Sequence, residues 1–423
     1  MHRAIVISTR GFGIFRFDLL REPGSVDFIG IFAEADAENL SPAQRARFAE
    51  VHVVPCGIRR PSPMLESLVD FDAARAAVEG VVARTPLEHV SLHCYDEQNV
   101  LLAARLRSHF GLDGAKYEDV LPFRDKCAMK ERVAASGLRV PAYGRYEPAP
   151  SARDREGAFR RIAAEVGLPF ILKPTDSAGS DGVYKVCSSS DFAALPADFG
   201  RDYEYEEFIA GTMYSVNIVS QNRRTVFGGV TEYLVNSFDV QSGRVNVDIN
   251  LSDRDPRVAR MVAFGETALE ALGRPDGASH LELFHTERDE LVFLEVAARF
   301  KGMAGLAAME RNYGIAFTNL AFEIETGIAS RPYDREQVYC FDGVIPKRGG
   351  RIVELVEPRI ESAFQMTWKV RPGEVVSQTD SLIANGGTFL VWNHDYDALY
   401  RDFERFAEYA PIRYEDAAVL VHP

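Results

Sequence analysis

Two glutamates, Glu282 and Glu295, lie in a segment whose alternating pattern predicts a β-hairpin. If the turn centres on Arg288 and Asp289, these glutamates face each other across the hairpin. Carboxylates about 5 Å apart repel by about 3 kcal/mol at an effective dielectric constant of about 20, so the pair needs compensation. Mg²⁺ held together with substrate phosphates supplies it, since this ion prefers hard oxygen ligands. The alternative is an exposed hairpin with solvated glutamates.

A second feature is Lys173, which ends an apolar strand and precedes a loop of small residues. A buried lysine is costly without an anion, and successive backbone N–H groups in such a loop can form an anion-binding nest. Phosphate suits both groups. The spacing matches neither a Walker A loop nor a dinucleotide fingerprint, and an ordinary hairpin turn is the alternative. The small residues of this loop are Ser177, Gly179, Ser180 and Gly182.

A third feature is the start of a predicted helix at Asp125 and Lys126. Asp125 is a suitable N-cap, and the helix is expected to end at Gly137. A helix N-terminus beside lysine side chains favours an anion, and Lys130 follows one turn later. A solvated helix face is the alternative.

The elements around these residues divide the chain into four expected parts. Up to residue 118, short apolar strands alternate with helical patterns, which predicts an open parallel α/β domain. Residues 119–202 carry the lysines and the glycine loop, and 203–330 carry further strands and the paired glutamates. Residues 331–423 form a β-rich subdomain with Gly and Pro turns. The expected fold class is therefore α/β combined with α+β.

Composition restricts the partners. The 423 residues carry a formal net charge of -14, which argues against nucleic acid or an anionic membrane as the main partner. The five cysteines are scattered and include no CxxC pair, which is typical of reduced thiols. The sequence shows neither a signal peptide nor an uncharged run of about 18 residues, so we expect a cytoplasmic location without a membrane segment.

Taken together and in this order, the motifs resemble the ATP-grasp superfamily. The resemblance runs from about residue 110 to 330 and includes an acidic-aromatic hinge strand and an arginine, Arg299, after the second glutamate. Within the superfamily, the segment that ends at Gly302 is similar to one in the bacilysin-synthetase type of L-amino acid ligase. The hinge strand is Glu206-Glu207-Phe208-Ile209.

The resemblance implies an ATP site between a lid sheet and a catalytic sheet, both antiparallel. Lys126 and Lys173 would bind phosphates beneath the glycine loop. The hinge would present main-chain groups of Glu207 and Ile209 to adenine, with the Glu206 side chain near its amino group. The paired glutamates would hold Mg²⁺, or Mn²⁺ in its place.

Two positions differ from the common family pattern. Ala297 stands where many members carry an asparagine metal ligand, so the resemblance leaves open whether one or two metal ions bind. Met213 stands where many members carry an acidic ribose contact, so ribose recognition must come from elsewhere.

The implied reaction joins a carboxylate to an amine. Phosphoryl transfer from ATP gives an acyl phosphate, the amine displaces phosphate, and Lys173 and Arg299 offset charge on the transferring group. The substrates would be small molecules such as amino acids, and similar proteins are commonly homodimers. Two alternatives stay open: an enzyme that uses bicarbonate or formate as the acid, and a catalytically silent ATP-binding regulatory protein.

Several residues are candidates for substrate contact. Ligands of α/β sheets collect at the C-terminal ends of the strands, and one predicted strand ends near His93 and Glu97. In contrast, Asn246, Asp248 and Asn250 alternate along one strand face and predict a solvated edge. The candidates are His93, Glu97, His280, Arg299 and Gly302.

Overall fold

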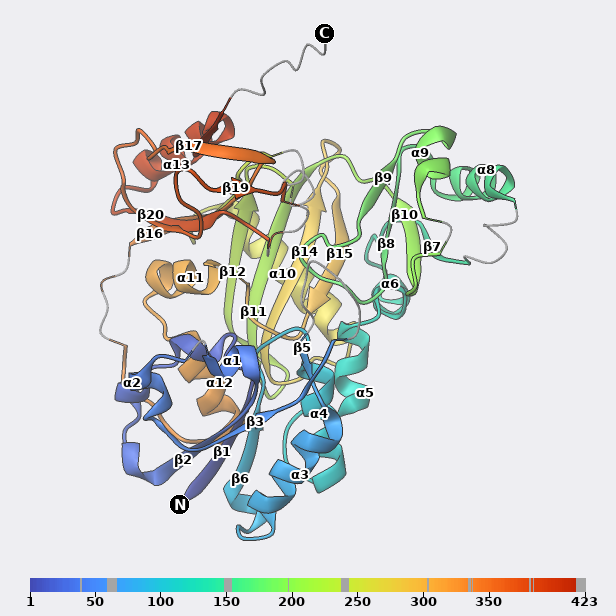
Figure 1. Ribbon diagram of the computed structural model, residues 1–423. Helices are drawn as coiled ribbons and strands as arrows, with labels where there is room; N and C mark the ends of the chain where they lie inside the picture. The colour runs from blue at the N-terminus through green and yellow to red at the C-terminus, as the bar shows by residue number, and fades with distance from the viewer. Residues whose placement is uncertain are drawn as a thin grey trace.

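The computed structural model describes most of the chain. The described residues are 1–38, 40–58, 67–147, 154–196, 198–236, 243–302, 304–333, 336, 338–379, 382 and 384–415. Two four-stranded sheets and one eight-stranded sheet form the framework of these residues (Figure 1). None of the described helices has the length and apolar character that a bilayer crossing requires.

The N-terminal part contains a parallel sheet in the order β3-β2-β1-β6. Ile5 and Ile7 of β1 pack in one hydrophobic cluster with α3 and α4, whereas Ala4 and Val6 pack in another with α12. Because both faces are covered, the two central strands contain apolar runs, at 4–7 in β1 and at 28–33 in β2. The elements are β1 (His2–Ile7), β2 (Val26–Ala33), β3 (Phe48–Val54), β6 (Val90–His93), α3 (Phe71–Val82), α4 (Val100–Phe110) and α12 (Phe317–Thr326).

A smaller antiparallel sheet has the order β7-β10-β8-β9 and lies at the upper right of Figure 1. Helices α8 and α9 pack on it through a cluster that includes Phe170 and Phe192. This sheet carries both Lys173 and the start of the hinge. Its elements are β7 (Tyr143–Tyr146), β8 (Phe170–Pro174), β9 (Tyr184–Val186), β10 (Tyr203–Glu207), α8 (Arg155–Val166) and α9 (Ser189–Ala194).

The largest sheet has eight strands in the order β15-β14-β11-β12-β13-β16-β20-β18. Helix α10 packs on β11 and β12, and helix α6 lies between β15 and the smaller sheet. The elements are β11 (Thr212–Gln221), β12 (Arg224–Tyr233), β13 (Asn246–Asn250), β14 (Gly277–His285), β15 (Leu291–Ala297), β16 (Tyr339–Ile345), β18 (Ala363–Trp368), β20 (Gly387–Asn393), α6 (Lys126–Ala135) and α10 (Pro256–Ala271). This sheet takes strands from both sides of residue 330, where the sequence predicts a boundary between two parts. The division into four parts stays a prediction.

The last part of the chain is β-rich, and the predicted fold class is confirmed. A three-stranded sheet in the order β19-β17-β21 lies beside the end of the large sheet, and α13 packs on β13, β16 and β20. The remaining elements are α1 (Glu34–Glu38), α2 (Pro42–Arg45), β4 (Cys56–Ile58), β5 (Ser67–Val69), α5 (Tyr117–Val120), α11 (Gly305–Tyr313), β17 (Gly350–Leu355), β19 (Val375–Val376), α13 (Tyr396–Arg405) and β21 (Ile412–Tyr414).

Candidate active site

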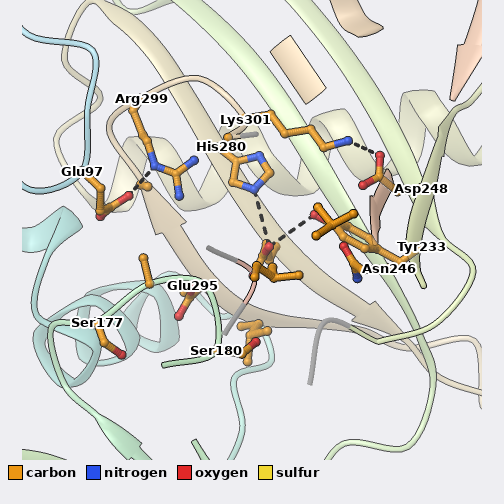
Figure 2. A pocket seen from close by; sticks show the side chains of 18 of the residues that line it. Glu97, Ser177, Ser180, Tyr233, Asn246, Asp248, His280, Glu295, Arg299 and Lys301 are labelled. Atoms are coloured by element: carbon orange, nitrogen blue, oxygen red, sulfur yellow. Dashed lines mark hydrogen bonds and ion pairs between the residues drawn. The ribbon is translucent and has the colours of Figure 1, made fainter. Parts of the chain in front are cut away.

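A cavity of about 760 Å³ is lined by residues of both antiparallel sheets and of the N-terminal part. Figure 2 shows side chains from these elements converging on it. Most of the residues singled out in the sequence line this cavity, although they come from widely separated segments. They are Glu97, Lys126, Lys173, Ser177, Gly179, Ser180, Glu206, Glu207, Phe208, Ile209, His280, Glu282, Glu295, Arg299 and Gly302.

Two candidates are not among the lining residues. His93 is fully buried; its Nδ1 contacts Glu325, and its Nε2 lies 2.6 Å from the hydroxyl of Ser91. The side chain therefore points toward α12 instead of the end of the strand, which corrects the expected position. A Cβ atom at Gly182 would lie 2.4 Å from the Arg201 guanidinium, so this glycine faces Arg201 and not the cavity.

The two glutamates pair directly in the hairpin of β14 and β15. Nζ of Lys126 lies 3.3 Å from Oε2 of Glu295, and Nε2 of His280 lies 3.5 Å from Oε1 of Glu282. Burial opposes ionisation of Glu282, but His280 and then Arg299 keep the pKa of this carboxyl below its ordinary value. The predicted pairing of Glu282 with Glu295 is confirmed, and Lys126 and His280 lie beside the two carboxylates.

The residue types suit a hard divalent cation. The two carboxylates face the same cavity, and carboxylate oxygens are the ligands that Mg²⁺ prefers. In the described part of the chain, no group of three or more His, Cys, Asp or Glu side chains could hold a metal ion. Mg²⁺ commonly takes one or two carboxylates and completes its shell with water and phosphates, so a pair is sufficient.

His280 is fixed beside Glu282. Its Nδ1 lies 2.8 Å from Oδ1 of the buried Asn217, so in the Nδ1–H tautomer it donates to that oxygen. Burial lowers the pKa of His280, which favours the neutral ring. The hydroxyl of Tyr233 donates to Glu282 over 3.3 Å from the other side. The position of the Glu282 carboxylate is thus defined by both neighbours.

Lys173 and Lys130 converge on the hinge glutamate. Nζ of Lys173 lies 2.6 Å from Oε1 of Glu206, and Nζ of Lys130 lies 2.7 Å from its Oε2 and 2.5 Å from Oε1 of Glu204. All four side chains are buried. Burial opposes ionisation of Glu206, but Lys130 and Lys173 lower its pKa to about 2. Both oxygens of Glu206 therefore lie against lysines, and the expected position of this side chain near the adenine amino group stays a prediction.

Lys130 and Glu204 were not chosen as site residues from the sequence. A usable signal exists, because Glu204 and Glu206 alternate on β10 and therefore share one face. Glu204 also pairs with Lys173 in the register of β10 and β8. Two glutamates on a buried strand face require cations nearby.

The loop after β8 is tied to the start of α6. The Asp125 side chain accepts hydrogen bonds from the N–H groups of Cys127 and Ala128, each over 2.9 Å, which confirms the predicted N-cap. Nζ of Lys126 donates to the carbonyl of Ser177 over 2.6 Å. Lys126 therefore contacts both the loop and the acidic pair, and it links the two predicted anion-binding features.

Arg299 is held by Glu97. Nε of Arg299 lies 2.5 Å from Oε2 of Glu97, and Arg124 contacts the other carboxylate oxygen. Burial opposes ionisation of Glu97, but Arg124 and then Arg299 lower its pKa to about 2. The Glu97 carboxylate, whose lowered pKa favours the ionised form, holds the guanidinium of Arg299 at the cavity wall (Figure 2).

The expected solvated edge at Asn246, Asp248 and Asn250 is wrong. These residues are only 4%, 3% and 1% exposed, because β13 lies inside the large sheet between β12 and β16. Asn246 and Asp248 line the cavity. Asp248 pairs directly with Asp342 of β16, and Nζ of Lys301 contacts both carboxylates. The sequence pattern did not indicate this cluster.

The stability of the protein should depend on pH through Asp248. Burial and then Asp342 raise the pKa of Asp248 from 3.8 to about 8, against the effect of Lys301. A carboxyl with a higher pKa in the folded state binds its proton more tightly there, so its contribution is full below about pH 4 and is lost as the pH rises toward about 8. We expect the free energy of unfolding to fall over this range by less in Asp342→Asn than in the wild type. Urea unfolding at several pH values measures this difference; identical slopes would contradict the shift.

Comparisons with known proteins relate part of this chain to one family and most of it to two ligases. The family described as ATP-grasp domain matches residues 123–303. An L-arginine-specific L-amino acid ligase of Bacillus subtilis is 21% identical over 75% of this chain and 78% of its own. The alanine–anticapsin ligase of Bacillus subtilis strain 168 is 22% identical over 67% of this chain and 66% of its own.

The fold also matches a solved structure. The crystal structure of an L-amino acid ligase from Bacillus licheniformis superposes with a TM-score of 0.71 and 16% identity, covering 98% of this chain and 99% of that one. The matched family segment spans α6, the hinge, and the hairpin with the two glutamates. The chain therefore contains an ATP-grasp domain at residues 123–303 and has the fold of the ATP-grasp ligases.

Proposed function

We propose that this protein is an ATP-dependent carboxylate-amine ligase that joins amino acids or related small metabolites through an acyl phosphate. The observation that carries the proposal is the cavity in which Glu282, Glu295, Lys126, Lys173 and Arg299 meet. These are the charges that phosphoryl transfer needs, because its transition state requires positioning and neutralisation rather than a protein nucleophile. The relatives named as amino acid ligases support the choice of acid and amine.

In this proposal the hinge holds the nucleotide base. Ile171, Met213 and Phe284 contribute apolar wall near the hinge residues of the cavity. Nζ of Lys185 lies 3.9 Å from the ring centroid of Phe208, a cation–π contact that holds the hinge side chain. Met213 is 3% exposed and belongs to this apolar wall, so it supplies packing where many relatives have an acidic residue.

The phosphates would lie between the lysines and the glutamate pair. Lys126 and Lys173 would neutralise them, and the loop with Ser177 and Gly179 would cover them with backbone N–H groups. Bound between Glu282 and Glu295, Mg²⁺ or Mn²⁺ would neutralise charge on the β- and γ-phosphates. Closure of the loop would exclude water, which otherwise hydrolyses an acyl phosphate.

Arg299 would hold the carboxylate that receives the phosphoryl group. Its guanidinium is already oriented by Glu97 and by the carbonyl of Phe300, which accepts from Nη1 over 2.7 Å. Fixing the acid in this way would convert the transfer into an effectively intramolecular step. Glu97 acts through Arg299 in this scheme and is a positioning residue.

The test is a phosphate-release screen of the purified protein. The protein is incubated with ATP, Mg²⁺ and pooled amino acids, singly and in pairs, and products are identified by mass. Bicarbonate and formate are included as acids, because they distinguish the alternative group of ATP-grasp enzymes. Phosphate release that depends on both an acid and an amine supports the ligase. ATP binding without release under any condition would support the catalytically silent alternative.

Lys173→Ala should lower turnover by about 100-fold, since it removes a cation from the transferring phosphate. The variant should still fold, because Lys130 continues to pair with Glu206. Initial rates of phosphate release measure the effect. Arg160→Ala on the exposed side of α8 is the matched control and should keep the wild-type rate. Wild-type turnover in Lys173→Ala would remove this lysine from the mechanism.

A further inference from the structure

One wall of the cavity holds two directly opposed aspartates. Asp248 of β13 pairs with Asp342 of β16, and both are almost completely buried. Nζ of Lys301 contacts Asp248 and lies 3.0 Å from Oδ1 of Asp342. Figure 2 shows Asp248 and Lys301 on the side of His280 opposite Arg299 and Glu97. This wall of the cavity is therefore separate from the wall that carries Arg299.

The charges of this wall balance only while one carboxyl keeps its proton. Two carboxylates and one ammonium leave one negative charge when all three groups are ionised. A buried charge without a partner is strongly unfavourable, so the cluster holds either that proton, in line with the raised pKa of Asp248, or one further positive charge in its place. Since Asp248 and Asp342 both line the cavity, a ligand can supply that charge.

A second group points to the same ligand. Asn246 precedes Asp248 by two residues on β13, so both side chains lie on one face of the strand. Asn246 is 4% exposed and lines the cavity, yet its Nδ2 has no hydrogen-bond partner in the described structure. A buried donor without an acceptor costs about 1–3 kcal/mol. An oxygen of a bound ligand would satisfy it.

The amine nitrogen that attacks the acyl phosphate is not a suitable occupant of this wall. An amine attacks an acyl phosphate only as the free base, and an ammonium held by two carboxylates keeps its proton more tightly. A nitrogen that stays protonated throughout the reaction has no such conflict. A metal ion is also a poor occupant, because Lys301 already lies between the two carboxylates.

We propose that Asp248, Asp342 and Asn246 form a substrate subsite for a protonated nitrogen that takes no part in bond formation, with Asn246 donating to a neighbouring oxygen. This inference rests on the proposed ligase function. The nitrogen belongs either to a cationic side chain of one substrate or to the α-ammonium group of the amino acid that serves as the acid. Both sources share the same chemistry and are separable by experiment.

The test uses Asp342→Asn in the full chain. This change leaves one carboxylate opposite Lys301, so the cluster is neutral without an added proton or a ligand cation, and the fold should be retained. Asp402→Asn is the matched control: Asp402 is equally buried, accepts from the N–H groups of Glu361 and Ser362, and is not a lining residue of the cavity. Urea unfolding of both variants shows that they are folded.

Substrate pairs of equal size distinguish the two sources. L-lysine with L-norleucine, and L-arginine with L-citrulline, test the side chain; L-alanine with L-lactate as the acid tests the α-ammonium group. In the wild type, kcat/KM should be at least about 10-fold higher for the charged member of one kind of pair, in line with a hydrogen bond to a charged group. Asp342→Asn should lose this preference, and Asp402→Asn should keep it. An equal rate for charged and neutral members, or an unchanged preference in Asp342→Asn, would overturn the subsite and leave the ligase function intact.

Calorimetry separates failure of the subsite from failure of the ligase. If no acid and amine pair gives turnover, the same compounds are titrated into protein that holds ADP and Mg²⁺. Selective binding of the charged members, lost in Asp342→Asn, would support the subsite even though the proposed reaction fails. Equal binding, or no binding of any member, would overturn it.

Discussion

Glu295→Gln is expected to lower ligase turnover by about 100- to 1000-fold. Glutamine keeps the size of the side chain but removes the charge from one of two carboxylates that would share a divalent cation. A contact of this kind with charge that develops in the transition state is worth about 2.7–4 kcal/mol. Because Glu295 contacts Lys126 over 3.3 Å, the change also leaves that lysine without its carboxylate.

Initial rates over a series of Mg²⁺ concentrations measure this effect. Weaker metal binding should appear as a higher Mg²⁺ concentration for half-maximal rate, which a purely structural defect would not produce. Glu287→Gln is the matched control, since Glu287 is exposed at the turn of the same hairpin. A Glu295→Gln rate within about threefold of the wild type would show that the metal is held elsewhere.

The opposition of the two glutamates was predictable, although its geometry was only partly so. The assumed turn placed every opposed pair in one constant register, whereas Leu283 pairs with Phe293 and the register shifts between Glu282 and Leu283. The pairs nearest the turn are centred on Arg288 alone and not between Arg288 and Asp289, and a β-bulge at Leu294 restores the pairing of Glu282 with Glu295. Hydrophobic alternation reveals a hairpin, but it does not reveal a bulge.

The residues that sequence reasoning missed are those whose meaning depends on distant partners. Asp248, Asp342 and Lys301 come from separate segments, and nothing in the alternation of β13 shows whether it is an edge strand or a central one. The partner that makes it central, β16, begins at Tyr339. His93 illustrates the same limit, because its position near a strand end was visible and its contact with Glu325 was not.

The ATP-grasp motifs could be recognised because each is local. Lys126 follows a capping aspartate, and Lys173 ends an apolar strand before a glycine loop. Their common function requires tertiary structure, since it depends on α6 lying between the hairpin and the smaller sheet. Local patterns therefore predicted most of the residues that we propose to bind phosphate, but not the cluster of Asp248, Asp342 and Lys301.

Lys130→Met should have the largest effect on stability, about 3–5 kcal/mol, which is the usual cost of removing one partner from a buried ion pair. Lys130 is fully buried and bonded to both Glu204 and Glu206. Without Lys130, Lys173 could not neutralise both glutamates, because its Nζ lies 2.6 Å from Glu206 but 3.8 Å from Glu204. Urea unfolding at neutral pH measures the loss.

Two further variants decide whether charge is the cause. Arg132→Met, on the exposed side of the same helix, should change stability by less than about 0.5 kcal/mol. The double variant Lys130→Met with Glu204→Leu removes both members of the pair and should recover most of the loss, because an apolar pair of similar volume replaces a buried ion pair at little cost. A single Lys130→Met variant within about 1 kcal/mol of the wild type would mean that Glu204 gains a proton instead, and the hinge glutamate would then depend on Lys173 alone.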